Sequence, residues 1–152
     1  EFVEAYFPLR VEQYEFIVDS GGAGLHRGGN GLSVAYRFLV DGHIGIHDDR
    51  WLTYPWGVNG GKPGMRSTKL LVRTDGSEEY IPAKCEDVKV QKGDLLYFNT
   101  WGGGGWGDPL KRDPLIVTAD VSKKLVSVEG ARRYGVVIND DLTLDNEAPE
   151  LL

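Results

Sequence analysis

The sequence contains a single cysteine and none of the long apolar runs that a membrane-spanning helix requires. Because Cys85 is the only thiol among the 152 residues, no disulfide forms within the chain, which favours a reducing compartment. No histidine adjoins Cys85 in the sequence, and this disfavours a role as nucleophile. The apolar runs stay far below the ~20 residues needed to cross a bilayer, and no signal-peptide pattern opens the chain. We therefore expect a cytoplasmic protein that does not associate with membranes.

Positive charge is also scarce. The 17 lysines and arginines are outnumbered by 23 acidic residues, which gives a formal net charge of -6, and no basic run forms a footprint for nucleic acid. Two catalytic or binding motifs are missing as well. Neither Ser20 nor Ser33 lies in a Gly-x-Ser-x-Gly nucleophile elbow, and no glycine cluster ends in the Gly-Lys-Ser/Thr of a phosphate-binding loop. We expect no nucleic-acid partner and no hydrolysis by these serines.

Glycine, by contrast, is abundant. The 21 glycines gather mainly in residues 19–31 and 101–109 without the three-residue period of collagen. Consecutive backbone N–H groups in such clusters can form anion-binding nests, so phosphate binding stays an alternative. The favoured interpretation is that the glycines supply positive φ angles and room for close backbone packing against a partner chain.

The remaining pattern predicts a mainly β fold, sandwich- or barrel-like, with glycine-rich loops and two short C-terminal helices. Strands are expected where β-branched and aromatic residues concentrate, namely in 11–18, 32–40, 69–73, 79–81 and 95–100. Asp113 and Ser127 are candidate N-caps of the helices, and Gly135 is a candidate stop. We predict one domain over residues 1–138 and an acidic C-terminal extension over 139–152.

A histidine pair next to two aspartates raises the question of a metal site. In an extended strand the rings of His43 and His47 would lie about 13 Å apart, whereas ligands of one ion lie about 2 Å from it. A bend at Gly45 would be needed to bring the rings together beside Asp48 and Asp49. We therefore predict no metal site in this chain.

Charged and aromatic residues beside the glycine clusters are candidates for a reaction chamber or an interface, although each could be purely structural. These candidates are Asp19, His26, Arg27, Asp49, Arg50, Trp106 and Asp108. No catalytic residue is assigned. Three tryptophans offer a discriminating observation, because a subunit would leave them exposed for a partner whereas a stand-alone module would hide them. They are Trp56, Trp101 and Trp106.

Several motifs occur in an order that resembles the distal part of the hydantoinase B/oxoprolinase family, and the match extends over roughly residues 7–138. The clearest motifs are Phe7-Pro8-Leu9-Arg10, Asp19-Ser20-Gly21-Gly22-Ala23-Gly24, Arg27-Gly28-Gly29-Asn30-Gly31, Gly60-Gly61-Lys62-Pro63-Gly64, Gly102-Gly103-Gly104-Gly105-Trp106-Gly107-Asp108-Pro109 and Arg112-Asp113-Pro114. Two positions depart from the family pattern. Trp101 replaces an expected proline, and Asn30 stands where an apolar residue is commoner.

The resemblance implies a role inside an ATP-dependent, multi-subunit enzyme. The expected partners are a hydantoinase-A-like, ATP-handling subunit and a larger hydantoinase-B-like subunit, in a hetero-oligomer. ATP and a divalent metal are expected in those partners, with no cofactor bound by this chain. A separate small chain resembles the organisation of acetophenone carboxylases, which implies ketone carboxylation with this chain inactive alone. The alternatives are part of an ATP-dependent hydantoinase, 5-oxoprolinase or lactamase, and a stand-alone binding or scaffold module.

Overall fold

The computed structural model describes residues 2–139 and 141–145, and these divide into two compact units. The sheet unit comprises the described residues up to Glu15, Leu32–Thr53 and Arg66–Trp101. The glycine unit comprises Phe16–Gly31, Tyr54–Met65 and the described residues from Gly102 onward. Each unit has its own hydrophobic core. Within the described residues, no helix is long and apolar enough to cross a membrane.

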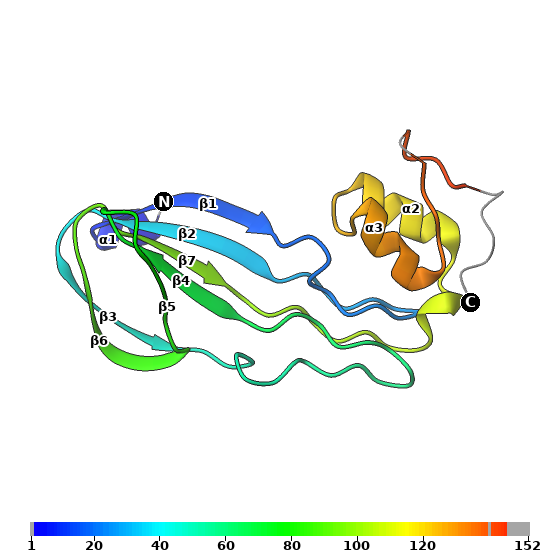
Figure 1. Ribbon diagram of the computed structural model, residues 1–152, viewed down its shortest axis with the longest axis horizontal. Helices are drawn as coiled ribbons and strands as arrows, with labels where there is room; N and C mark the ends of the chain where they lie inside the picture. Colours follow the sequence, from blue (N-terminus) through cyan, green and yellow to red (C-terminus); the bar gives the residue numbers. More distant parts are fainter. Residues whose placement is uncertain (1, 140, 146–152) are drawn as a thin grey trace. The chain divides into compact units, whose positions relative to one another are not determined.

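The sheet unit is built from seven strands and one short helix (Figure 1). A five-stranded sheet has the order β1-β2-β7-β4-β5, and a separate pair joins β3 to β6. Tyr97 of β7 lies opposite Ala35 of β2 on one side and Leu70 of β4 on the other, both in antiparallel register. The elements are α1 (Phe2–Tyr6), β1 (Leu9–Phe16), β2 (Leu32–Phe38), β3 (Gly42–His47), β4 (Thr68–Val72), β5 (Glu78–Tyr80), β6 (Lys84–Val90) and β7 (Leu95–Asn99).

The core of this unit lies where the strand pair covers the sheet. Phe38, Leu71 and Leu96 of the sheet pack with Ile46 of β3 and Val90 of β6. The prediction of a mainly β fold is thus confirmed, and the described residues form two packed sheets with no closed barrel. A hairpin turn that contains Asp75 and Gly76 joins β4 to β5.

A buried ion pair lies in the same unit. Lys69 on β4 is 1% exposed and pairs with Asp48, which follows β3. The Lys69 ammonium also lies 4.3 Å from the centre of the Phe98 ring. Burial lowers the pKa of Lys69 to about 8, because a charged ammonium is poorly solvated there. Asp48 was one of the residues considered for a metal site. Its carboxylate is instead paired with Lys69.

The glycine unit contains three extended segments, 16–31, 54–65 and 102–108, each hydrogen-bonded to the other two (Figure 1). The Gly22 N–H donates to the Gly103 carbonyl at 2.8 Å, the Gly105 N–H donates to Lys62 at 2.9 Å, and the Lys62 N–H donates to Ala23 at 2.7 Å. We call this three-segment arrangement the glycine lattice. Its contacts are made by backbone, so they leave little space for side chains.

The reason for so much glycine is steric. A Cβ at Gly22, Gly61 or Gly105 would lie closer than 3.0 Å to backbone atoms of a neighbouring segment, a distance that real Cβ atoms essentially never show. Of the glycines in the two predicted clusters, only Gly107 has a positive φ in the described residues. The interpretation that the clusters supply positive φ is corrected accordingly. The close backbone packing seen here is within the chain, and packing against a partner chain stays a prediction.

Helices complete the glycine unit after the lattice. They are η1 (Pro109–Lys111), α2 (Pro114–Ser122), α3 (Val128–Ala131) and η2 (Arg132–Tyr134). Asp113 caps α2 by accepting from the Leu115 N–H at 2.9 Å, and Ser127 caps α3 by accepting from Gly130 at 2.8 Å. Gly135 ends η2 with φ 71°. Both predicted caps, the stop and the two short helices are confirmed.

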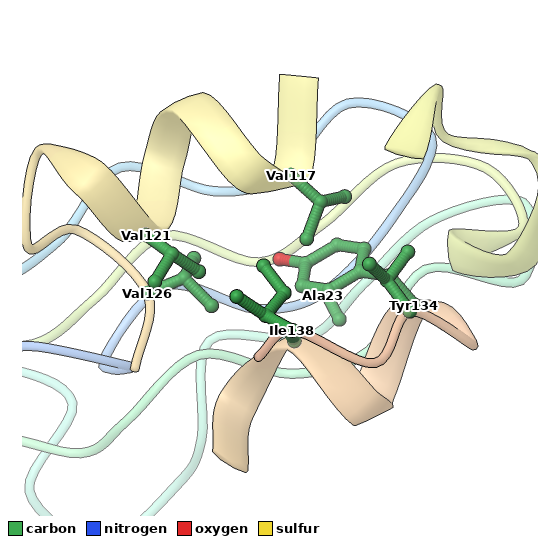
Figure 2. Packing of buried hydrophobic residues seen from close by; sticks show 8 residues of the cluster. Ala23, Val117, Val121, Val126, Tyr134 and Ile138 are labelled. Atoms are coloured by element: carbon green, nitrogen blue, oxygen red, sulfur yellow. The ribbon is translucent and has the colours of Figure 1, made fainter. Parts of the chain in front are cut away.

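These helices cover a small core of their own (Figure 2). Val117 and Val121 of α2 point toward Tyr134 and Ile138, and Ala23 of the lattice joins them. Leu144 packs against the same cluster and bridges to Ile138. The predicted C-terminal extension thus includes a residue in contact with the core, while residues 140 and 146–152 lie outside the described residues. The single domain over 1–138 stays a prediction.

Candidate functional site

The candidate site is built on the glycine lattice at His26 and Trp106. These residues form an antiparallel bridge in which the His26 N–H donates to Trp106 at 3.0 Å and the Trp106 N–H donates to His26 at 2.8 Å. Their rings lie 5.5 Å apart, tilted by 36°. Trp106 is 46% exposed. Two of the predicted site residues are therefore neighbours, although 80 positions separate them in the sequence (106 minus 26).

Next to this bridge, two arginines share one carboxylate. Arg27 donates through Nε to Oδ2 of Asp120 at 3.1 Å, and Arg112 donates through Nη2 to the same oxygen at 2.8 Å. All three side chains are mostly buried, with exposures of 16%, 11% and 12% for Arg27, Arg112 and Asp120. Arg112 also donates to the Leu25 carbonyl at 2.8 Å. The cluster holds α2 to the lattice and carries a net charge of about +1.

A polar cavity of about 320 Å³ opens over this cluster, and it is lined by His26, Arg27, Gly28, Gly29, Arg112 and Asp120. Nε of Arg112, one of the lining residues, is buried without an acceptor among the described residues. The Tyr134 hydroxyl, whose ring lies 6.0 Å from the Arg112 guanidinium, is likewise buried and unpaired there. Burial raises the pKa of Tyr134.

Two other predicted site residues have structural contacts in the same unit. Asp19, with φ 62°, accepts from the Ser127 N–H at 3.1 Å and from Arg133 at 2.8 Å, so it connects the first lattice segment to α3. Asp108 accepts from the Leu110 N–H at 3.0 Å and caps η1. These contacts give both aspartates a structural role, and neither lines the cavity.

The remaining candidates, Asp49 and Arg50, belong to the sheet unit. The Asp49 side chain is 76% exposed and lies 3.4 Å from Lys84. Arg50 has φ 57°, and its carbonyl accepts from the Ser67 N–H at 3.0 Å. Both residues shape the chain that leaves β3, and neither is among the residues that line the polar cavity.

The histidine pair considered for metal binding lies on β3. His43 is 3.8 Å from Asp87, and His47 is hydrogen-bonded to Glu86, so each ring faces a different carboxylate. A β-bulge occurs between Ile44 and Ile46, at the glycine where a bend was considered. Among residues 2–139 and 141–145, no group of three or more His, Cys, Asp or Glu side chains has an arrangement that could hold a metal ion.

Sequence reasoning found His26, Arg27 and Trp106 because they adjoin glycine clusters, but it missed four residues that line the cavity, Gly28 among them. Arg112 was visible only as part of a motif, and Asp120 lies 93 positions from Arg27, within a helix whose pattern gives no functional signal. Gly29 was hidden among other glycines of the same cluster.

The chain combines a mainly β unit with a glycine lattice that is followed by the helices α2 and α3. These features define a class of glycine-rich, mainly β protein segments. Residues 1–109 match the family described as hydantoinase B/oxoprolinase. The chain therefore belongs to the hydantoinase B/oxoprolinase family, as its motifs indicated.

Individual relatives agree with this assignment. The uncharacterized protein MJ0963 of Methanocaldococcus jannaschii is 36% identical over 157 residues, covering 100% of this chain and 27% of that protein. The crystal structure of the ATP-dependent caprolactamase from Pseudomonas jessenii aligns with a TM-score of 0.81 at 34% identity, covering 96% of this chain and 26% of that chain. A nucleotide-free structure of acetone carboxylase aligns with a TM-score of 0.68 at 21% identity, covering 94% and 24% respectively, and so shares the fold. The chain spans 27% of the length of MJ0963, 26% of caprolactamase subunit beta of Pseudomonas jessenii and 8% of 5-oxoprolinase 1 of Arabidopsis thaliana.

Proposed function

We propose that this chain is a structural component of an ATP-dependent, multi-subunit enzyme and completes the reaction chamber of a hydantoinase-B-like subunit. In this proposal the chain is inactive alone. Its partners are a hydantoinase-A-like subunit that handles ATP and a larger hydantoinase-B-like portion. ATP and a divalent metal bind in those partners, as the family resemblance implies.

The observation that carries the proposal is the exposure of three tryptophans. Trp56 is 66% exposed, Trp106 46% and Trp101 39%. Large exposed apolar side chains of this kind are typical of surfaces that a partner covers. A stand-alone module would be expected to bury them, so the exposure favours a subunit over a scaffold that works by itself.

For the reaction, the relatives favour ATP-dependent opening of a cyclic amide. The relative named caprolactamase subunit beta is 36% identical over 97% of this chain, and the caprolactamase structure gives the higher of the two TM-scores above. Ketone carboxylation, the reaction first expected from the motifs through acetophenone carboxylase, is the second candidate. It is supported by the fold likeness to acetone carboxylase.

In either reaction, the rigid lattice would exclude water from an activated intermediate. A phosphorylated or mixed-anhydride intermediate hydrolyses when it is solvated, so a closed chamber protects it. A lattice whose segments contact each other through backbone has little freedom to open, because any shift breaks several hydrogen bonds together.

The test is reconstitution of the complete enzyme from its native host, with and without this chain. We expect ADP release that depends on caprolactam or a hydantoin and that disappears when the chain is omitted. ADP release that instead requires a ketone and bicarbonate would select the second candidate. Full activity without the chain would refute the proposal.

A further inference from the structure

Gly29 differs from Gly21, Gly22, Gly24 and Gly28 of the same segment. A Cβ at Gly21, Gly22, Gly24 or Gly28 would lie closer than 3.0 Å to backbone atoms, whereas no heavy atom lies within 4 Å of the position that a Cβ would take at Gly29. The φ angle of Gly29 is not in the left-handed region either. Neither packing within the described residues nor backbone conformation requires glycine at this position.

The backbone N–H of Gly29 is also available. It has no acceptor among the described residues, although its carbonyl accepts from the Gly103 N–H at 2.8 Å. Gly29 is exposed and lines the polar cavity. A free N–H beside open space is the arrangement that lets a ligand approach the backbone closely, which is one of the recognised uses of glycine.

The charges around Gly29 specify the sign of such a ligand. Arg27 and Arg112 share the single carboxylate of Asp120, which leaves one positive charge in excess. Arg27 uses Nε for Asp120 and Nη1 for the Gly28 carbonyl and Asn30, so Nη2 has no acceptor in the described part of the chain. A guanidinium edge and a backbone N–H are both typical donors to oxyanions.

We propose that the cavity lined by Arg27, Gly28, Gly29 and Arg112 binds an oxyanion, the carboxylate or phosphoryl group of a small molecule. The Gly29 N–H and the Arg27 guanidinium donate to its oxygens, and the absent side chain at Gly29 leaves the space that the ligand occupies. Asp120 holds both arginines in place and is a positioning residue. This binding site is independent of the enzymatic role proposed above.

The experiment is an NMR titration of the full ¹⁵N-labelled chain with inorganic phosphate and, separately, with acetate. We expect saturable shifts of the Gly29 amide and the Arg27 Nε resonance. Gly29→Ala should weaken binding by about tenfold or more, since the new methyl group occupies the ligand's place. The same substitution should not lower the melting temperature, because no heavy atom of the described residues lies near that position.

Gly42→Ala is the matched control. A Cβ at Gly42 also meets no heavy atom within 4 Å, but this glycine begins β3 in the sheet unit, so phosphate binding should be unchanged. Arg27→Lys adds a second comparison, because it keeps the charge and loses the planar fork of donors. We expect about tenfold weaker binding, whereas general attraction to a positive surface would be unaffected.

Saturation by phosphate alone would support a phosphoryl ligand, and saturation by acetate would support a carboxylate. The inference is overturned if neither anion gives saturable shifts at Gly29, or if Gly29→Ala binds as well as the parent. Anion binding is measured on the chain without partner subunits or ATP turnover. Refutation of the proposed enzymatic role would therefore not change the anion-binding result, and absence of anion binding would not refute the enzymatic role.

Discussion

Gly24 offers a direct test of the glycine lattice. A methyl group at this position would lie 2.7 Å from both the backbone nitrogen and the carbonyl oxygen of Trp106, and 2.8 Å from the carbonyl oxygen of His26. All three obstacles are backbone atoms, so no side chain can rotate away to make room. Gly24→Ala must therefore displace the third lattice segment and break the two hydrogen bonds of the His26–Trp106 bridge.

The cost can be worked from these contacts. Overpacking a tight site costs about 1–3 kcal/mol, and two lost backbone hydrogen bonds add about 1 kcal/mol each. Reduced entropy of the unfolded chain returns about 0.4–1 kcal/mol. We expect Gly24→Ala to lower the free energy of unfolding by about 3 kcal/mol, which corresponds to a fall in melting temperature of about 6–12 °C.

The assay is urea unfolding of the full chain, monitored by tryptophan fluorescence. The free energy of unfolding is extrapolated to zero urea. Gly42→Ala makes the same chemical change at an open position, and we expect it to alter the unfolding free energy by less than about 1 kcal/mol. If the two variants were equally stable, the lattice would not be closely packed and the steric reason given for the glycine clusters would be wrong.

Three further predictions concern other parts of the chain. Lys69→Met should lower the free energy of unfolding in urea by about 3–5 kcal/mol, because Asp48 would stay buried without its counter-charge. Adding Asp48→Asn should recover most of that loss. Additive effects of the two substitutions would show that the two side chains do not interact. The pKa of Glu12 is lowered to about 2 by hydrogen bonds from Arg37 and then Arg10, so the stability from this pair is present above about pH 4.5 and is lost as pH falls toward 2. Arg37→Gln should raise that pKa in a carbon-detected NMR titration, and an unchanged midpoint would contradict the pairing. Trp106→Ser should change stability by less than about 1 kcal/mol but weaken association with partner subunits by about 2 kcal/mol or more in sedimentation; unaltered association would place the interface elsewhere.

Local signals explain what the sequence could predict about the fold. Helix caps and stops act on residues close to them in the sequence, so they can be predicted from the sequence. The structure confirms the N-caps Asp113 and Ser127 and the stop at Gly135. The strands rich in β-branched and aromatic residues were found for the same reason. Strands β3 and β6 were missed because Gly42 and Gly45 interrupt the first, and the second, Lys84–Val90, carries charged residues among its apolar ones.

The candidate site was only half predictable for a different reason. His26, Arg27 and Trp106 stand beside glycine clusters, which marked them. The partners that define the cavity are distant in sequence, and their contacts arise when α2 packs on the lattice. The role of the glycines was also misjudged, since their number in the sequence does not reveal whether a Cβ would meet another segment of the same chain or empty space.

That distinction connects stability to binding in this molecule. Lattice glycines such as Gly22, Gly24 and Gly28 are required because backbone from another part of the lattice fills the space of their side chains. The hydrogen bonds of the lattice fix the position of Arg27 and its neighbours. Gly29 lies at the edge of the same lattice with that space open. A substitution inside the lattice, such as Gly24→Ala, should therefore weaken anion binding indirectly by moving the His26–Trp106 bridge that adjoins the cavity. Gly29→Ala should weaken it directly with no loss of stability. Measuring unfolding and anion binding on both variants separates the glycines that build the site from the one that admits a ligand.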